Sequence, residues 1–203
     1  MNLPTKRAMD LLMAVPALLL SLPVQGATAL AVRLSMGRPV LFRQQRPGLW
    51  GEPFEMMKFR TMHLPDPERG LVTDEQRMTK VGAFLRSTSL DELPTLWNIV
   101  RGDMSVVGPR PLLMQYLDRY TPEQARRHEV RPGLTGLAQV NGRNAISWEA
   151  KFAYDVEYVD KASPILDIVI IIRTVLAVLR RDGISAAGES TMPEFRGTPS
   201  ETA

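Results

Sequence analysis

The first pattern along the chain is an apolar stretch near its N-terminus. Between Arg7 and Arg33 lie 25 residues, of which Asp10 is the only charged one. As one helix they would measure about 37 Å, which is enough to cross a bilayer core. Three structures account for this length: a signal peptide with small residues at 27–29, a single membrane span, and a helix that enters one leaflet, bends and returns.

Pro23 and the charges at both ends of this stretch favour the third structure. Pro23 removes a backbone donor and clashes with the carbonyl of Leu19, so a bend is expected near the middle, at which a re-entrant helix would be broken. Basic residues lie on both sides: Lys6 and Arg7 before the stretch, and Arg33, Arg38, Arg43 and Arg46 after it. The positive-inside rule places both flanks in the cytoplasm, which a single crossing does not allow. The pattern predicts a re-entrant helical hairpin over residues 1–36, with the span and the signal peptide as alternatives.

A period of two residues follows. Apolar and basic positions nearly alternate over residues 39–45 and 53–62, on either side of the turn-rich segment 47–51. This arrangement predicts a two-stranded hairpin. Lys58 and Arg60 would share one face of it, where they either receive phosphates or are solvated.

The remainder of the chain is dominated by helical spacing. Helices are predicted over 78–88, from the acid pair described below to about 101, and over 121–130, 148–160 and 164–181, with short strands at 104–107 and 137–140. The last helix is expected to be a core or interfacial helix, because its charged residues leave too short an apolar run to span a membrane comfortably. The predicted fold is mixed α/β and helix-rich, with one catalytic domain over 37–185 and a loosely ordered tail over 186–203.

Composition narrows the classes of function. The 203 residues are 44% hydrophobic, which suits one well-filled core. The chain has no cysteine, so disulfides and thiolate metal sites are excluded, and His63 and His128 lie too far apart to suggest zinc. A net charge of +3 permits an anionic partner. The basic residues are dispersed and no nucleic-acid-binding motif is present, so nucleic acid is not an expected partner.

The candidate chemistry lies in an adjacent acid pair, Asp91 and Glu92. Ser89 and Glu92 have capping-box spacing, which predicts a helix start with both acids in its first turn, although Pro94 would move that start one or two residues along. Adjacent carboxylates can act as nucleophile, base or metal ligand. Three arginines flank the pair and suit phosphate oxygens: Arg86, Arg101 and Arg110. The alternative is a helix cap with structural ion pairs.

The wording around these acids is more specific than the pair itself. LRSTSLDELPTLWNIVRGDMSVVGPRPL resembles the central signature of the bacterial sugar transferases, the monotopic phosphoglycosyl transferases. The resemblance extends in order through KR, PVLFRQQRPG, KFRTM, RPGLTGLAQVNGRN and ISWEAKFAYDVEYV, and covers nearly all of residues 6–185. By length and by its C-terminal third, the chain is similar to the small, bacillosamine-type members.

This resemblance implies an enzyme on the cytoplasmic face of the bacterial inner membrane. Its members move a sugar-1-phosphate from a UDP-sugar to polyprenol phosphate and release UMP. The similarity to the small members implies an N-acetylated amino sugar. A non-catalytic membrane scaffold and a UDP-releasing glycosyltransferase are the alternatives.

The resemblance also implies roles for individual residues. Asp91 matches the nucleophile, which forms a covalent phosphosugar intermediate and contacts Mg²⁺. Glu92 matches its partner acid, either as a general base or in positioning the acceptor. The arginines that match phosphate-binding or nucleotide-binding positions are Arg86, Arg110 and Arg143. The matches to the membrane anchor are Lys6, Arg7 and Pro23, with Leu22 standing where the family has the serine of a Ser-Pro pair.

Overall fold

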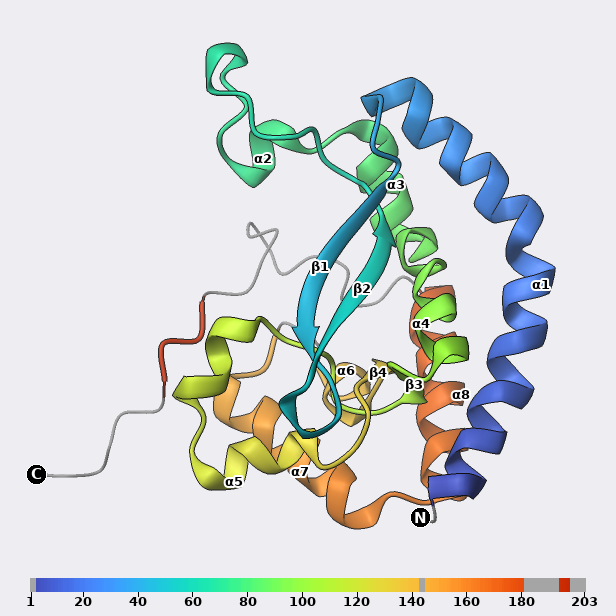
Figure 1. Ribbon diagram of the computed structural model, residues 1–203, viewed down its shortest axis with the longest axis vertical. Helices are drawn as coiled ribbons and strands as arrows, with labels where there is room; N and C mark the ends of the chain where they lie inside the picture. Colours follow the sequence, from blue (N-terminus) through green and yellow to red (C-terminus); the bar gives the residue numbers. More distant parts are fainter. Residues whose placement is uncertain (1–2, 143–144, 181–193, 198–203) are drawn as a thin grey trace, which may run out of the picture.

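The computed structural model describes residues 3–142, 145–180 and 194–197, and Figure 1 shows their arrangement. One long helix, α1 (Leu3–Met36), curves along one side of the molecule. Two two-stranded sheets and several short helices form the rest. The predicted mixed, helix-rich fold is confirmed at this level.

The bend predicted for the segment around Pro23 is present as curvature (Figure 1), but the predicted break is wrong, because α1 is one uninterrupted helix that contains this proline. Figure 1 shows α1 bowed instead, with its concave side toward the body of the protein. A proline removes one backbone hydrogen bond, and a long helix absorbs that loss as curvature. Polar side chains near Pro23 add hydrogen bonds within the helix: Ser21 Oγ donates to the Leu18 carbonyl at 3.0 Å, and Gln25 donates to Ser21 Oγ at 2.9 Å.

Much of α1 carries apolar side chains that face outward. Leu12, Leu20 and Leu34 are each at least 75% exposed. Among the described residues, α1 is the one helix long and apolar enough to cross a membrane, with a mean hydropathy of 1.7 in its most apolar window. This is compatible with membrane association. The re-entrant course stays a prediction.

The hairpin is confirmed. β1 (Leu41–Pro47) pairs antiparallel with β2 (Pro53–Phe59), and the one-turn helix η1 (Leu49–Gly51) forms the tip. Helix α4 (Thr95–Arg101) lies between β2 and α1 (Figure 1). Asn98 of α4 is fully buried and joins α4 to β2. Its side chain accepts from Met57 N at 3.1 Å and donates to Glu55 O at 2.7 Å.

Between β2 and the 3₁₀ turn η3 (Leu90–Glu92), which precedes α4, the chain forms three short elements. These are η2 (Pro67–Arg69), α2 (Asp74–Arg77) and α3 (Lys80–Ser87), of which α3 confirms the helix predicted over 78–88. Gly82 lets α3 approach the preceding chain closely, because a Cβ at this position would lie 1.7 Å from Thr61 O. Leu85 of this helix faces the core, whereas its neighbour Phe84 is 58% exposed.

The C-terminal half is built around a short parallel pair, β3 (Ser105–Val107) and β4 (Gly133–Thr135). The strand predicted at 137–140 is wrong: these residues form the helical turn α6 (Leu137–Val140). The strand lies earlier because Gly133 has no side chain, and a Cβ there would meet Gly108 N at 2.1 Å. The surrounding helices are η4 (Met114–Arg119), α5 (Pro122–Ala125), η5 (Arg126–His128), α7 (Trp148–Lys161) and α8 (Pro164–Arg180).

The hydrophobic core joins α1 to the body. Ala14 and Leu18 of α1 pack with Leu96, Ile99 and Met104. α8 is two-sided: Ile170 is fully buried, whereas six other apolar side chains are exposed, namely Ile165, Ile168, Val169, Ile172, Val175 and Leu176. Both α1 and α8 therefore present apolar surface to the outside.

Candidate active site

The two acids lie in a single 3₁₀ turn, η3 (Leu90–Glu92), ahead of α4. The predicted cap at Ser89 is wrong: Ser89 has φ 57°, in the left-handed region, and its side chain makes no capping hydrogen bond. Pro94 is the physical reason, because it lacks the N–H that a helix begun at Ser89 would need, and α4 instead begins at Thr95. The acids are thus held between two helices rather than inside one.

Glu92 is clamped by two cations from distant parts of the chain. Its Oε1 accepts from Lys58 Nζ at 2.5 Å and from Arg110 Nη2 at 2.9 Å. The Glu92 and Lys58 side chains are mostly buried, with exposed fractions of 21% and 16%. Burial alone would raise the pKa of Glu92, but the charges of Arg110 and Lys58 outweigh it and hold that pKa well below its usual range. Glu92 is therefore ionised at neutral pH.

Asp91 has the opposite electrostatics. Burial and then the negative charge of Glu92 raise the pKa of Asp91 to about 6, while Lys58, Arg86 and Arg110 act in the other direction. The pKa values of the two neighbouring carboxyls are therefore shifted in opposite directions. Such a separation is typical of acids with different chemical roles.

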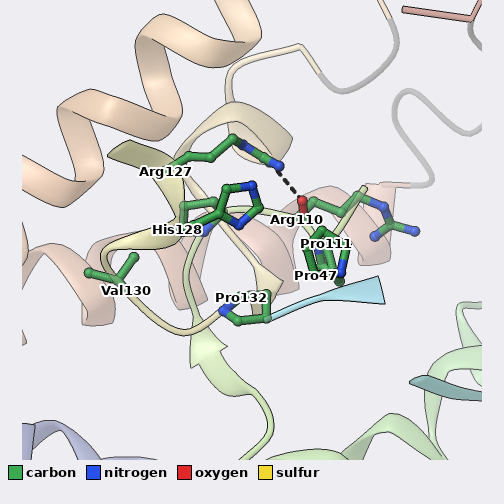
Figure 2. Close-up of a pocket in the computed structure, with 8 residues that line it drawn as sticks. Pro47, Arg110, Pro111, Arg127, His128, Val130 and Pro132 are labelled. Carbon is green, nitrogen blue, oxygen red and sulfur yellow. Dashed lines mark hydrogen bonds between the residues drawn. The ribbon is translucent and has the colours of Figure 1, made fainter. Parts of the chain in front are cut away.

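Arg110 is held in position through its backbone. Arg127 Nη2 donates to the Arg110 carbonyl at 2.7 Å, and Figure 2 shows the Arg110 side chain pointing away from this bond. Arg127 is buried and forms an ion pair with Asp155, Nη2 to Oδ2, at 2.7 Å. Pro109 and Pro111 restrict the backbone on either side. The position of Arg110 is therefore well defined, and the charge of Glu92 raises the pKa of Arg110.

Arg86 is brought to the same region. Its Nε donates to Thr61 Oγ1 at 3.1 Å, and its charge lowers the pKa of Asp91. Of the three arginines predicted for substrate, Arg86 and Arg110 thus lie near the acids. Arg143 lies outside the described residues.

A cavity of about 100 Å³ opens beside Glu92. Its charged lining comes from Glu92, Arg46, Lys58 and Arg110, and Met56, Leu112 and Leu134 contribute apolar surface. Burial and the nearby Arg110 lower the pKa of Arg46 to about 10, so it remains a cation at neutral pH. The cavity therefore has three cations around one carboxylate and is suited to an anion.

Arg46 is a site residue that sequence reasoning missed. Lys58 was predicted to share a hairpin face with Arg60 and either to receive phosphates or to be solvated, but its contact with Glu92 was not predicted. Arg60 instead turns to the end of α1 and donates to the carbonyls of Met36, Gly37 and Arg38. A signal was available in the wording KFRTM and PVLFRQQRPG, which contains Lys58 and Arg46.

No group of three or more histidine or acidic residues that could hold a metal is found in residues 3–142, 145–180 and 194–197. Mg²⁺ is commonly bound through one or two carboxylates together with substrate phosphates. Asp91 is half-buried and precedes Glu92, which lines the cavity suited to an anion, so its carboxylate fits that mode of binding.

The predicted anchor residues Lys6 and Arg7 contact protein groups. Lys6 Nζ lies 2.5 Å from Asp167 Oδ2 and 3.4 Å from Asp10 Oδ1, and both acids are buried. Arg7 donates to the Ile99 and Val100 carbonyls near the end of α4, at 2.5 and 2.6 Å. Their role at a membrane surface stays a prediction.

The site therefore combines an acid pair with cations suited to phosphate, in a protein whose helix α1 is compatible with membrane association. The chain belongs to the bacterial sugar transferase family, whose model matches residues 1–181. The family resemblance seen in the sequence is confirmed, and the protein is a transferase.

Individual relatives extend this result. The chain is 52% identical over 194 residues to the "Uncharacterized sugar transferase EpsL" of Bacillus subtilis (strain 168), covering 95% of this chain and 96% of that protein. It is 42% identical over 189 residues to a "UDP-glucose:undecaprenyl-phosphate glucose-1-phosphate transferase" of Caulobacter vibrioides, covering 87% and 70%. A protein of the same name from Escherichia coli (strain K12) is 42% identical over 181 residues, which are 84% of this chain and 39% of that protein.

Proposed function

We propose that this protein transfers a sugar-1-phosphate from a UDP-sugar to polyprenol phosphate and releases UMP. The observation that carries the proposal is the acid pair. The pKa of Asp91 is raised to about 6, while Glu92 is held ionised between Lys58 and Arg110. Membership of the family and the names of the Caulobacter and Escherichia relatives support the same reaction.

The reaction we propose has two displacements at one phosphorus atom. A carboxylate oxygen of Asp91 attacks the sugar-bearing phosphorus of the donor, and the bond to the bridging oxygen breaks so that its electron pair leaves with UMP. A phosphate oxygen of the polyprenol acceptor then attacks the same phosphorus and releases Asp91. The products are UMP and a polyprenol-diphosphate-linked sugar.

The cations answer the main electrostatic difficulty, which is an anionic nucleophile approaching an anionic diphosphate. Arg46, Lys58 and Arg110 around the cavity would offset the phosphate charge, and Arg86, whose charge acts on Asp91, would add to them. Mg²⁺, which we expect Asp91 to contact, would supply further neutralisation of the diphosphate when bound.

Glu92 is better suited to positioning than to proton transfer. Its lowered pKa makes it a weak proton acceptor at neutral pH. The phosphate of the acceptor is already largely ionised near pH 7, so its attack needs no strong base. We therefore assign Glu92 to holding Lys58 and Arg110 beside the acceptor and donor phosphates.

We place the enzyme on the cytoplasmic face of the bacterial inner membrane. The outward-facing apolar residues of α1 and α8 support contact with lipid, and basic residues at both ends of α1 support a helix that returns to the side it entered. The donor we expect is a UDP-linked N-acetylated amino sugar, because the C-terminal third is similar to bacillosamine-type members. UDP-glucose is the second donor to test, because the Caulobacter and Escherichia relatives are named as UDP-glucose transferases.

The test is nucleotide release by the detergent-purified protein with Mg²⁺, polyprenol phosphate and a panel of UDP-sugars. We expect UMP from the wild type, none from Asp91→Asn, and none from the wild type with excess EDTA. Release of UDP would identify direct glycosyl transfer instead. Near-normal activity of Asp91→Asn would refute the nucleophile, and a folded wild type that releases neither nucleotide would favour the scaffold.

A further inference from the structure

The segment 194–197 is docked onto the protein body, within a tail that the sequence predicts to be loosely ordered. Phe195 is only 2% exposed. Its ring lies among four aromatic rings, with centroid distances of 4.9 to 5.9 Å, contributed by Tyr116, Tyr120, Trp148 and Phe152. We call these four side chains the aromatic socket. Pairs of this kind are worth more than area burial alone, so the contact is specific.

Polar contacts fix the backbone of the segment in the same place. Phe195 N donates to Tyr116 Oη at 3.3 Å, and Arg119 donates to the Phe195 carbonyl at 2.5 Å. Glu194 Oε1 accepts from Arg119 at 2.7 Å and from Gln115 at 2.8 Å. The segment is therefore held in a defined register by both its side chains and its main chain.

Two rings of the aromatic socket also contact Arg127, the buried arginine that fixes the backbone of Arg110. The Arg127 guanidinium carbon lies 5.7 Å from the ring centroids of both Tyr120 and Phe152, and Arg127 donates to Tyr120 Oη at 3.3 Å. Arg127 then donates to the Arg110 carbonyl at 2.7 Å, and Arg110 contacts Glu92 at 2.9 Å. A continuous series of contacts thus joins Phe195 to the acid pair.

We propose that residues 194–197 form an intramolecular latch, in which Phe195 fills the aromatic socket and positions Arg110 through Arg127. This inference rests on the proposed function, because Arg110 is assigned there to substrate phosphate. Phe195 is a positioning residue and touches no reacting group. Without it, Tyr120 and Phe152 lose an aromatic packing partner, and the rings that contact Arg127 hold it, and so the Arg110 backbone, less firmly.

The first measurement is hydrogen exchange of the tail in the full chain. We expect slow exchange around Phe195 in the wild type and fast exchange in Phe195→Ala, while Arg196→Ala, which alters an exposed neighbour, stays protected. Fast exchange around Phe195 in the wild type would overturn the latch, and this readout does not depend on catalysis.

The second measurement is UMP release by the same three proteins. We expect kcat/KM to fall about tenfold in Phe195→Ala, because small misplacements of a binding group cost large factors in rate, and to stay near the wild-type value in Arg196→Ala. A synthetic peptide of residues 190–199, STMPEFRGTP, should restore part of the lost rate at millimolar concentration. The same peptide with alanine in place of phenylalanine should not.

The outcomes separate the latch from the proposed function. A wild-type rate for Phe195→Ala, or a loss that the peptide leaves unchanged, would overturn the positioning role while UMP release by the wild type still supports the reaction. A wild type that releases no UMP would overturn the reaction and the positioning role together. Docking of the tail would then still be decided by hydrogen exchange.

Discussion

The ionised forms of Asp91 and Glu92 are expected to affect stability in opposite directions. The pKa of Asp91 is about 6 against an ordinary value of 3.8, so the folded protein favours its protonated form. The stability from that form is fully present below about pH 4 and is lost as the pH rises through 6. Ionised Asp91 is therefore a cost to the fold at pH 7.

The size of this cost follows from the pKa difference. About two units at about 1.4 kcal/mol each give an upper value of about 3 kcal/mol, which solvent screening of the half-buried side chain reduces to about 1–2 kcal/mol. Asp91→Asn mimics the protonated acid and should recover this energy at pH 7. For a chain of this size the melting temperature should rise by about 2–8 °C.

Glu92→Gln is the matched control, with the opposite expected sign. The stability from ionised Glu92 is present above about pH 4 and is lost as the pH falls through its lowered folded-state pKa. Neutral glutamine at pH 7 loses two charge-assisted bonds, to Lys58 and Arg110, and should cost about 1–3 kcal/mol.

The measurement is thermal unfolding of the wild type, Asp91→Asn and Glu92→Gln in one detergent, at pH 4 and pH 7 and at one scan rate. The gain in Asp91→Asn should be present at pH 7 and absent at pH 4. A lower melting temperature for Asp91→Asn at pH 7, or an equal gain at both pH values, would refute the electrostatic account of the site.

Three further predictions follow from the structure. If Asp91 attacks as the carboxylate, kcat/KM should fall tenfold per pH unit below about pH 6, measured by UMP release at donor concentrations below KM. Gly82→Ala places a Cβ 1.7 Å from Thr61 O, and the displacement of α3 should lower stability by about 1–3 kcal/mol or more in thermal unfolding. Lys6→Met leaves the buried carboxylate of Asp167 without its cation and should lower stability by about 3–5 kcal/mol by the same measurement.

Each of these has its own contrary result. An acid limb well below pH 5 would show that Asp91 does not titrate as described. Gly26→Ala, at a helical glycine with open space around it, should be neutral or stabilising by up to about 1 kcal/mol. An equal loss of stability in both variants would show that the steric contact with Thr61 is not the cause of the Gly82→Ala effect. Arg33→Met removes an exposed cation from the other end of α1 and should change stability by less than about 0.5 kcal/mol. A similar loss in Lys6→Met and Arg33→Met would argue against the buried ion pair.

The elements that the sequence predicts well are those with an uninterrupted local pattern. The hairpin follows from alternation around a turn-rich tip, and α7 follows from helical spacing after Ser147, which does cap it. The failures lie where one local rule competes with another. Ser89 fits a capping box, yet Pro94 denies the helix its backbone donor. Pro23 is expected to break α1, yet a helix of this length absorbs the defect as a bend.

The site is divided in the same way. Asp91 and Glu92 are adjacent in the chain, so their pairing is visible without a structure. Their cations are not, because Lys58 lies 34 residues before Glu92 and Arg110 lies 18 residues after it. Which cation meets which carboxylate depends on how β2 packs against α4, and that is a property of the tertiary fold. The docking of Phe195 likewise depends on rings from η4 and α7 that come together only in three dimensions.

The ion pair between Lys6 and Asp167 also sets a time for folding. These residues are 161 positions apart, and a ribosome that adds about 5–20 residues per second needs roughly 8–32 s to make the second after the first. During that interval Lys6 has only Asp10, one helical turn away, as its acidic partner. A nascent chain arrested before Pro164 should therefore leave the Lys6 amine open to labelling, whereas the finished chain protects it. Helix α1 is in this way synthesised well before the residue that completes its buried ion pair.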